Sequence, residues 1–120
     1  MSPDGIGVPD LGAYEVLSDT RHKEAGLRVL LVKKGIRIKP HYHERCTQVY
    51  FIIDGRAEIV VGGQPIQARQ MDVVRIPPCT VHGLRALVRT VALSISVPPL
   101  DPEDQVVVDE PTPAGPFYAK

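Results

Sequence analysis

The stretch GIRIKPHYHERCTQVYFIIDG, residues 35–55, decides how the rest of this chain can be interpreted. It carries two histidines, His41 and His43, with one residue between them. On a β-strand both side chains would leave from the same face, with Cα atoms about 6.6 Å apart. At that separation two imidazoles can bind one metal ion through N–metal bonds of about 2.1 Å. A helix would point them apart, and Pro40 with its β-branched neighbours argues against a helix.

Outward from this stretch, short apolar runs alternate with turn signals. Asp54–Gly55 and Gly62–Gly63 are strong turn dipeptides, and no segment shows the 3.6-residue period of an amphipathic helix. This pattern predicts an all-β sandwich or barrel. Residues 13–17 are expected to form a short strand or turn, residues 18–26 a loop, and residues 105–108 an edge strand, against this barrel or another subunit. The other strands are predicted at residues 26–33, 36–43, 48–53, 56–61, 64–68, 71–76, 81–86 and 89–97.

The chain length of 120 residues predicts one domain with a single core. We expect a lead-in with a first strand over residues 1–25 and a barrel over residues 26–99. A proline-rich tail is expected over residues 100–120, with a loose end.

Composition argues against several classes of function. The chain has 14 basic and 14 acidic residues, so it lacks the basic excess typical of a nucleic-acid partner. No run approaches the ~20 apolar residues of a membrane span. The first residues have neither the basic start nor the apolar stretch of a secretory signal. The two cysteines form no paired metal-binding motif. A cytoplasmic protein with free thiols is therefore expected, with no nucleic-acid or membrane partner.

Two spaced motifs resemble those of the cupin family. The first runs as Gly35-x5-His41-x-His43-x4-Gln48-x6-Gly55, and the usual family form has Glu where Gln48 stands. The resemblance covers most of the chain, from about residue 27 to residue 99, because a second motif follows at the expected separation.

The second motif is residues 71–82, MDVVRIPPCTVH. Pro77 and His82 occupy their family positions, whereas Met71 and Cys79 replace the two glycines of the usual form. The resemblance implies a double-stranded β-helix, which is the jelly-roll barrel of a small single-domain cupin. It also implies a homodimer and a small-molecule ligand or substrate in the barrel mouth.

The resemblance further implies that His41, His43, Gln48 and His82 bind one divalent transition metal ion. Three neutral imidazoles and an oxygen suit iron, zinc, manganese, nickel or copper. The alternative is that these are polar residues of a barrel that holds no metal.

Gln48 is the informative departure from the family pattern. Its carbonyl oxygen is a weaker ligand than a carboxylate and cannot act as a base. With neutral ligands the metal would keep its full charge, which favours an anionic substrate. The alternative is that Gln48 only forms hydrogen bonds inside the barrel.

Three further residues are candidates for substrate contacts. Strict alternation along residues 36–43 aims Arg37 and Lys39 at the barrel interior, where a substrate carboxylate or phosphate would pair with them. A bulge at Pro40 would break this parity and leave both as solvated charges at the rim. Tyr50 shares the parity of Gln48 and is a candidate catalytic proton donor or a hydrogen-bond donor to substrate; packing in the core is the alternative.

The functional prediction is a metal-dependent enzyme that acts on a small oxygen-bearing, anionic molecule. Within the family, a dioxygenase is slightly favoured over an isomerase, cyclase, lyase or decarboxylase. The alternative is a non-catalytic cupin that binds or senses a small ligand, and the lack of a carboxylate among the ligands supports it.

Overall fold

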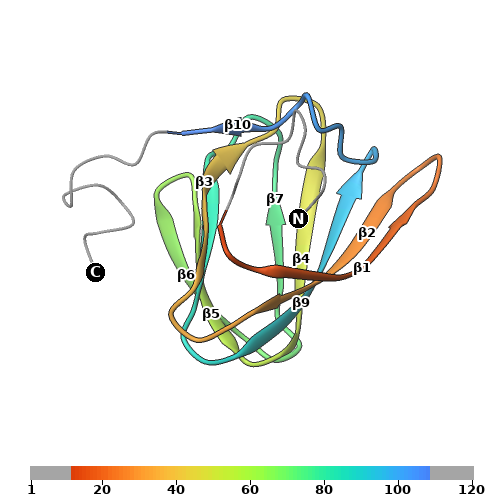
Figure 1. The fold of residues 1–120 in the computed structure, drawn as a ribbon. Coiled ribbons are helices and arrows are strands. Elements are labelled where there is room, and N and C mark those ends of the chain that lie inside the picture. Colours follow the sequence, from red (N-terminus) through yellow and green to blue (C-terminus); the bar gives the residue numbers. More distant parts are fainter. Residues whose placement is uncertain (1–11, 109–120) are drawn as a thin grey trace.

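The computed structural model describes residues 12–108, and within this range the chain forms ten β-strands and no helix. No helix in this range is long and apolar enough to cross a membrane. Figure 1 shows the strands around a common interior. Their bounds are β1 Glu15–Arg21, β2 Gly26–Val32, β3 Arg37–Tyr42, β4 Thr47–Asp54, β5 Arg56–Val61, β6 Gln64–Arg69, β7 Val73–Ile76, β8 His82–Ala86, β9 Thr90–Val97 and β10 Val106–Val107.

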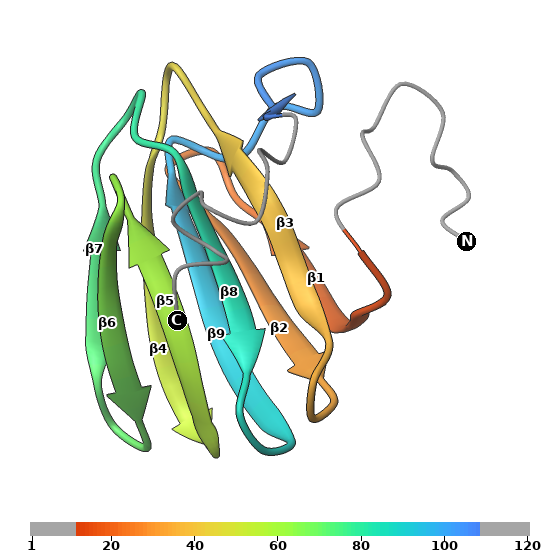
Figure 2. The ribbon, with the colours of Figure 1, turned by 90° about the vertical axis from the view of Figure 1, so that its left-hand side faces the viewer.

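The strands make two antiparallel five-stranded sheets that face each other. One sheet has the order β1-β2-β9-β4-β7 and the other β10-β3-β8-β5-β6. Figure 2 shows the second sheet in front of the first. The chain crosses repeatedly from one sheet to the other, so neighbours within a sheet are mostly distant in sequence. This is the jelly-roll arrangement, and it confirms the predicted all-β fold class.

The interior is apolar at one end and polar at the other. Along β9 the inward positions run from Thr90 and Ala92 to Ser94 and Ser96, and all four are buried. Along the neighbouring β4, Ile52 pairs with Ala92, whereas Gln48 pairs with Ser96. The apolar end holds the structure together, because removing aliphatic side chains from water stabilises a fold by about 25 cal/mol per Å². The polar end is where a site can form. The core cluster comprises Leu30, Val32, Ile38, Tyr50, Ile52, Ala57, Ile59, Ala68, Val74, Ile76, Leu84, Ala86 and Ala92.

The first strand differs from the prediction. β1 extends to Arg21, so the expected loop over residues 18–26 is wrong for its first four residues. Every residue of β1 is exposed, and the strand exists because its backbone pairs with β2, with a bulge between Val16 and Ser18. A strand with two exposed faces needs no apolar alternation, so its sequence resembles a loop.

The C-terminal segment returns to the barrel of its own chain. β10 lies within the predicted edge strand over residues 105–108 and pairs with β3, with Val107 opposite His41. The expected loose end of the tail falls on residues 109–120, and most of the expected lead-in falls on residues 1–11; both lie outside the described residues.

The two residues that replace motif glycines both have positive φ, at 76° for Met71 and 61° for Cys79. Only glycine adopts such angles without steric cost, so both positions have the backbone conformation that favours the glycine of the usual motif. At Cys79 this turn aims the backbone N–H at the carbonyl oxygen of His43, 2.6 Å away. The second motif is thereby tied to the first.

Candidate metal centre

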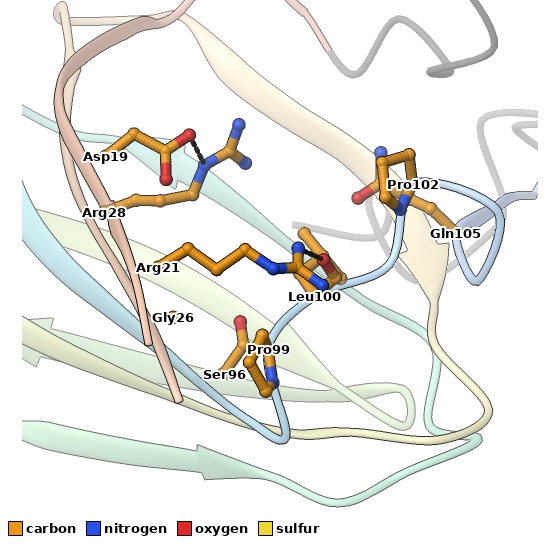
Figure 3. Close-up of a pocket in the computed structure, with 9 residues that line it drawn as sticks. All are labelled: Asp19, Arg21, Gly26, Arg28, Ser96, Pro99, Leu100, Pro102 and Gln105. Carbon is orange, nitrogen blue, oxygen red and sulfur yellow. Dashed lines mark hydrogen bonds and ion pairs between the residues drawn. The ribbon is translucent and has the colours of Figure 1, made fainter. Parts of the chain in front are cut away.

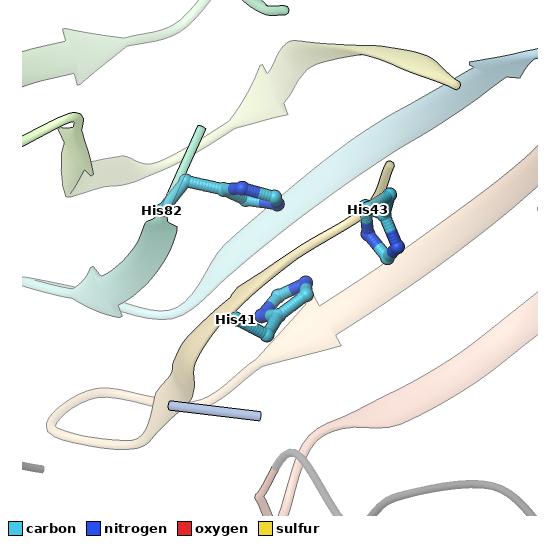
Figure 4. Close-up of side chains that lie close together, drawn as sticks. All are labelled: His41, His43 and His82. Atoms are coloured by element: carbon cyan, nitrogen blue, oxygen red, sulfur yellow. The ribbon is translucent and has the colours of Figure 1, made fainter. Parts of the chain in front are cut away.

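Three buried histidines converge at the polar end of the barrel. His41 on β3 lies opposite His82 on β8, and His43 follows β3 by one residue. Their ring centroids lie 4.3 to 5.5 Å apart, and one nitrogen of each lies within 4.8 Å of the others. Each residue is at most 2 % exposed. Figure 4 shows the three rings directed toward one another, two from β3 and the residue after it and one from β8.

A bulge in β3 produces this convergence. The ladder with β8 shifts between Ile38 and His41, at the point where Pro40 has no N–H to donate. Ile38 and His41 therefore both face the interior, although they are three residues apart.

The same bulge moves the two predicted substrate contacts off the histidine face. Arg37 pairs with Arg85 beside the inward pair of Ile38 and Leu84, and both Arg37 and Lys39 are half-buried. Strict alternation through the proline is therefore not followed. A role for Arg37 and Lys39 in substrate binding stays a prediction.

Each histidine ring is oriented by a backbone carbonyl. The Nδ1 atom of His41 donates to the Lys39 oxygen at 2.7 Å, and that of His82 donates to the Thr80 oxygen at 2.9 Å. His43 Nδ1 donates to the Asp104 oxygen at 2.8 Å. In a neutral imidazole the proton then sits on Nδ1, so Nε2 keeps its lone pair for a metal.

Three atoms in the middle of the site are hydrogen-bond acceptors without a donor. Gln48 Oε1 lies 2.9 Å from His82 Nε2, while the amide nitrogen donates to the Ser94 and Ser96 hydroxyl oxygens at 3.3 and 3.4 Å. Because His82 already donates through Nδ1, these two close atoms are both acceptors. His43 Nε2 is buried without any hydrogen-bond partner. A divalent cation would satisfy all three atoms, so the residues present fit a metal ion.

Burial keeps the three rings uncharged. Burial, followed by the neighbouring His82, lowers the pKa of His41 from 6.5 to about 3. Burial also lowers the pKa of His82 to about 4 and shifts the pKa of His43 downward. Neutral imidazoles are the form that metals bind, so the site is ready for a cation at neutral pH.

Asp104 holds the site from a position far away in sequence. Its carboxylate accepts hydrogen bonds from the backbone N–H groups of Glu44 and Arg45 at 2.7 and 2.8 Å. Its own carbonyl oxygen orients His43. Burial alone would raise the pKa of this carboxyl, but the two N–H donors outweigh it and hold the pKa below its usual range. This residue gives the segment before β10 a role that sequence reasoning missed.

Tyr50 is buried next to the site. Its ring centroid lies 6.4 Å from that of His82, and burial raises the pKa of its hydroxyl. The group therefore stays protonated at neutral pH. This protonation state is compatible with the predicted proton donor, whose catalytic role stays a prediction, and Tyr50 also belongs to the core cluster.

A cavity of about 360 Å³ lies near the site, although no histidine lines it (Figure 3). Ser96 lines it and also accepts from Gln48, and Gln105 lines it next to Asp104 in the chain. Arg21 and Arg28 lie on its wall, and sequence reasoning missed both. Arg28 has the parity of the core residues Leu30 and Val32, which is the signal that would have found it.

An all-β barrel with three inward histidines that could hold a metal ion defines a class of small barrel proteins with a candidate metal site, and comparison with known proteins gives the family. The model of the cupin domain family matches residues 27–97, so the chain belongs to the cupin family. This confirms the resemblance seen in the two motifs.

Individual relatives are more distant. Quercetin 2,3-dioxygenase of Bacillus subtilis (strain 168) is 38 % identical over 52 residues, which are 43 % of this chain and 15 % of that enzyme. An uncharacterized protein of Methanocaldococcus jannaschii is 26 % identical over 81 residues, 66 % of this chain and 65 % of that protein. The chain thus spans less than two thirds of the length of both relatives.

Among solved structures, an uncharacterized protein from Klebsiella pneumoniae with a double-stranded β-helix domain superimposes with a TM-score of 0.67. It is 20 % identical, and the match covers 92 % of this chain and 96 % of that one. This likeness agrees with the predicted double-stranded β-helix.

The role of Asp104 gives the first prediction. In Asp104→Ala the anchor of the segment is lost and His43 Nδ1 loses its fixed acceptor, so zinc affinity should fall about tenfold or more. Competition with a chromophoric chelator measures the affinity. Asp104→Asn keeps one acceptor oxygen and should recover part of the loss. The control is Asp101→Ala, which removes an exposed ion pair with Arg45 in the same segment. Equal affinities for Asp104→Ala and Asp101→Ala would contradict the assignment.

The lowered pKa values give the second prediction, for the metal-free protein. As pH falls below 6.5 the unfolded chain takes up protons that the folded chain does not, so stability is lost progressively toward pH 3 to 4. Between pH 6.5 and 5 the loss should be about 2 kcal/mol for each of His41 and His82. Urea unfolding at the two pH values measures it.

The matched variant is His82→Gln, whose free energy of unfolding should depend less on pH over the same interval. Asp and Glu carboxylates stay largely ionised above pH 5, so the interval isolates the histidines. A wild-type protein equally stable at pH 6.5 and pH 5 would show that the buried rings do not titrate as described.

Proposed function

We propose that this cupin is a metal-dependent enzyme that acts on a small oxygen-bearing molecule. One observation carries the proposal: three neutral, buried imidazoles bring one ring nitrogen each within 4.8 Å of one another. His41, His43 and His82, with the carbonyl oxygen of Gln48, would hold one divalent transition metal ion. Bound there, the metal would supply Lewis-acid or redox chemistry to a substrate oxygen.

The chain's own residues would perform three tasks around that ion. The backbone carbonyls of Lys39, Thr80 and Asp104 keep the imidazoles in the tautomer that binds metal. Ser94 and Ser96 hold the Gln48 amide so that its oxygen faces the histidines. Tyr50 keeps its proton at neutral pH and would donate it, or a hydrogen bond, to substrate.

Within this class we favour a dioxygenase over an isomerase, cyclase or lyase. The local likeness to quercetin 2,3-dioxygenase supports this choice, although it spans only 15 % of that enzyme. The metal would be iron, manganese, nickel or copper for oxygen chemistry, and zinc would suit the non-redox alternatives.

A non-catalytic cupin that binds or senses a small ligand is the second candidate. The specific observation in its favour is that the cluster of possible metal ligands among residues 12–108 contains only His and no carboxylate. Gln48 cannot serve as a base, and the buried Tyr50 hydroxyl is a poor one.

The expected homodimer also belongs to this proposal. β1 is an edge strand with the exposed apolar residues Val16 and Leu17, 42 % and 54 % exposed, which suits a contact with a second copy.

Oxygen uptake with a panel of small enols, flavonols and hydroxy acids tests the enzyme proposal. Iron-, manganese-, nickel- or copper-loaded protein should consume oxygen with at least one of them and release an oxygenated product. His41→Ala, which removes one ligand, should bind little metal and consume none. His22→Ala is the matched control because His22 is exposed and lies outside the cluster.

Product without oxygen uptake would replace the dioxygenase by an isomerase or lyase. Saturable binding without any product, in every metal form, would favour the ligand-binding candidate instead.

A further inference from the structure

The cavity that Ser96 links to the histidine site has a cationic wall, which comes from the sheet opposite the one that carries His41 and His82. Arg28 on β2 pairs with Ser94 on β9, and Ser94 in turn pairs with Tyr50 on β4. These positions belong to the inward row, because the next inward residue of β2, Leu30, lies in the core cluster. Arg28 therefore faces the interior at the level of the polar end. Its side chain is 31 % exposed, so it is only partly screened by water.

The cavity carries more positive than negative charge. Arg21 and Arg28 line it together with one carboxylate, Asp19. Asp19 accepts from Arg28 Nε at 3.3 Å, and Arg21 donates through a terminal nitrogen to the Leu100 carbonyl oxygen at 2.8 Å. The ion pair uses the guanidinium nitrogen closest to the chain, and Figure 3 shows the two terminal nitrogens of Arg28 extending beyond it. A planar fork of this kind suits the two oxygens of a carboxylate.

The distance between the cationic wall and the histidines sets the size of the ligand. β2 and β4 are separated by two strand spacings, with β9 between them, which is about 10 Å. Gln48 on β4 faces the histidines, and Ser96 connects it to the cavity. A ligand with one oxygen group at the histidines would have its other end within reach of Arg28.

We propose that this cavity binds a small molecule by its anionic end, a carboxylate held by Arg28 with Arg21 nearby, while an oxygen group at the other end meets the metal. The metal end of this inference rests on the proposed function. The anionic substrate predicted from the sequence is retained, but its partners are Arg28 and Arg21 in place of Arg37 and Lys39.

A series of dicarboxylates tests the inference. Succinate, glutarate, adipate and suberate are titrated by calorimetry into zinc-loaded protein, each beside the monocarboxylate of equal chain length. The dicarboxylate of one chain length should bind about tenfold more tightly than the matching monocarboxylate, because only that dicarboxylate reaches both the metal and Arg28. In Arg28→Gln this advantage should vanish while zinc content stays unchanged, and Arg28→Lys should recover part of it.

Two variants sharpen the result. Asp19→Asn removes the carboxylate that competes for Arg28, so it should strengthen dicarboxylate binding a few-fold, opposite in sign to Arg28→Gln. Arg75→Gln is the matched control, because Arg75 is exposed on β7 and pairs with the outward residue Val49. It should leave the advantage intact.

A tenfold advantage that survives Arg28→Gln, or no advantage at any chain length, would overturn the inference without bearing on the metal site.

If the wild type holds no zinc, the proposed function fails, and the inference is then tested on the metal-free protein. In the metal-free wild type, propionate should shift the amide NMR signals of residues 26–28. In metal-free Arg28→Gln the same shifts should be much smaller. Equal shifts in both would overturn it.

Discussion

Three uncharged imidazoles buried against one another are the constraint on which the polar end of this barrel depends. Burial removes the proton that each ring would carry in water, and a backbone carbonyl at each Nδ1 determines where the remaining proton sits. What is left is a group of lone pairs without donors, including a His43 Nε2 atom that has no partner. Polar atoms are rarely buried unsatisfied, so the arrangement makes sense as a cation site.

Irregularities in the surrounding backbone position the three histidines. The bulge at Pro40 brings His41 into line with Ile38, and the positive φ of Cys79 directs its N–H to the His43 carbonyl. Asp104 holds the segment before β10 against the turn after His43, and residues of that segment line the cavity. Hydrogen bonds therefore connect the histidines, the C-terminal segment and the cavity that this segment lines, so a substitution in one should alter the others.

Much of this could be predicted from the sequence, and the remainder depends on contacts that no local pattern records. The strands of the barrel follow from apolar runs and turn dipeptides, whereas the grouping of His41, His43, Gln48 and His82 is implied by the resemblance to the two cupin motifs. Strict alternation aims Arg37 and Lys39 inward, and the alternative raised from the sequence, a bulge at Pro40 that breaks this parity, is the one that the ladder shows. Alternation along β2 would have predicted that Arg28 faces inward, because it shares the parity of Leu30 and Val32. Asp104 was not, because its contacts with His43, Glu44 and Arg45 join residues about 60 positions apart in the chain.

The central claim is that three histidines and the Gln48 oxygen surround one metal ion. X-ray absorption spectroscopy of the zinc-loaded protein tests it most directly. We expect one zinc ion per chain with only nitrogen and oxygen neighbours at about 2.0 to 2.1 Å and the multiple-scattering pattern of three imidazoles. Fewer than three imidazoles, or a sulfur neighbour at about 2.3 Å from Cys46 or Cys79, would contradict it.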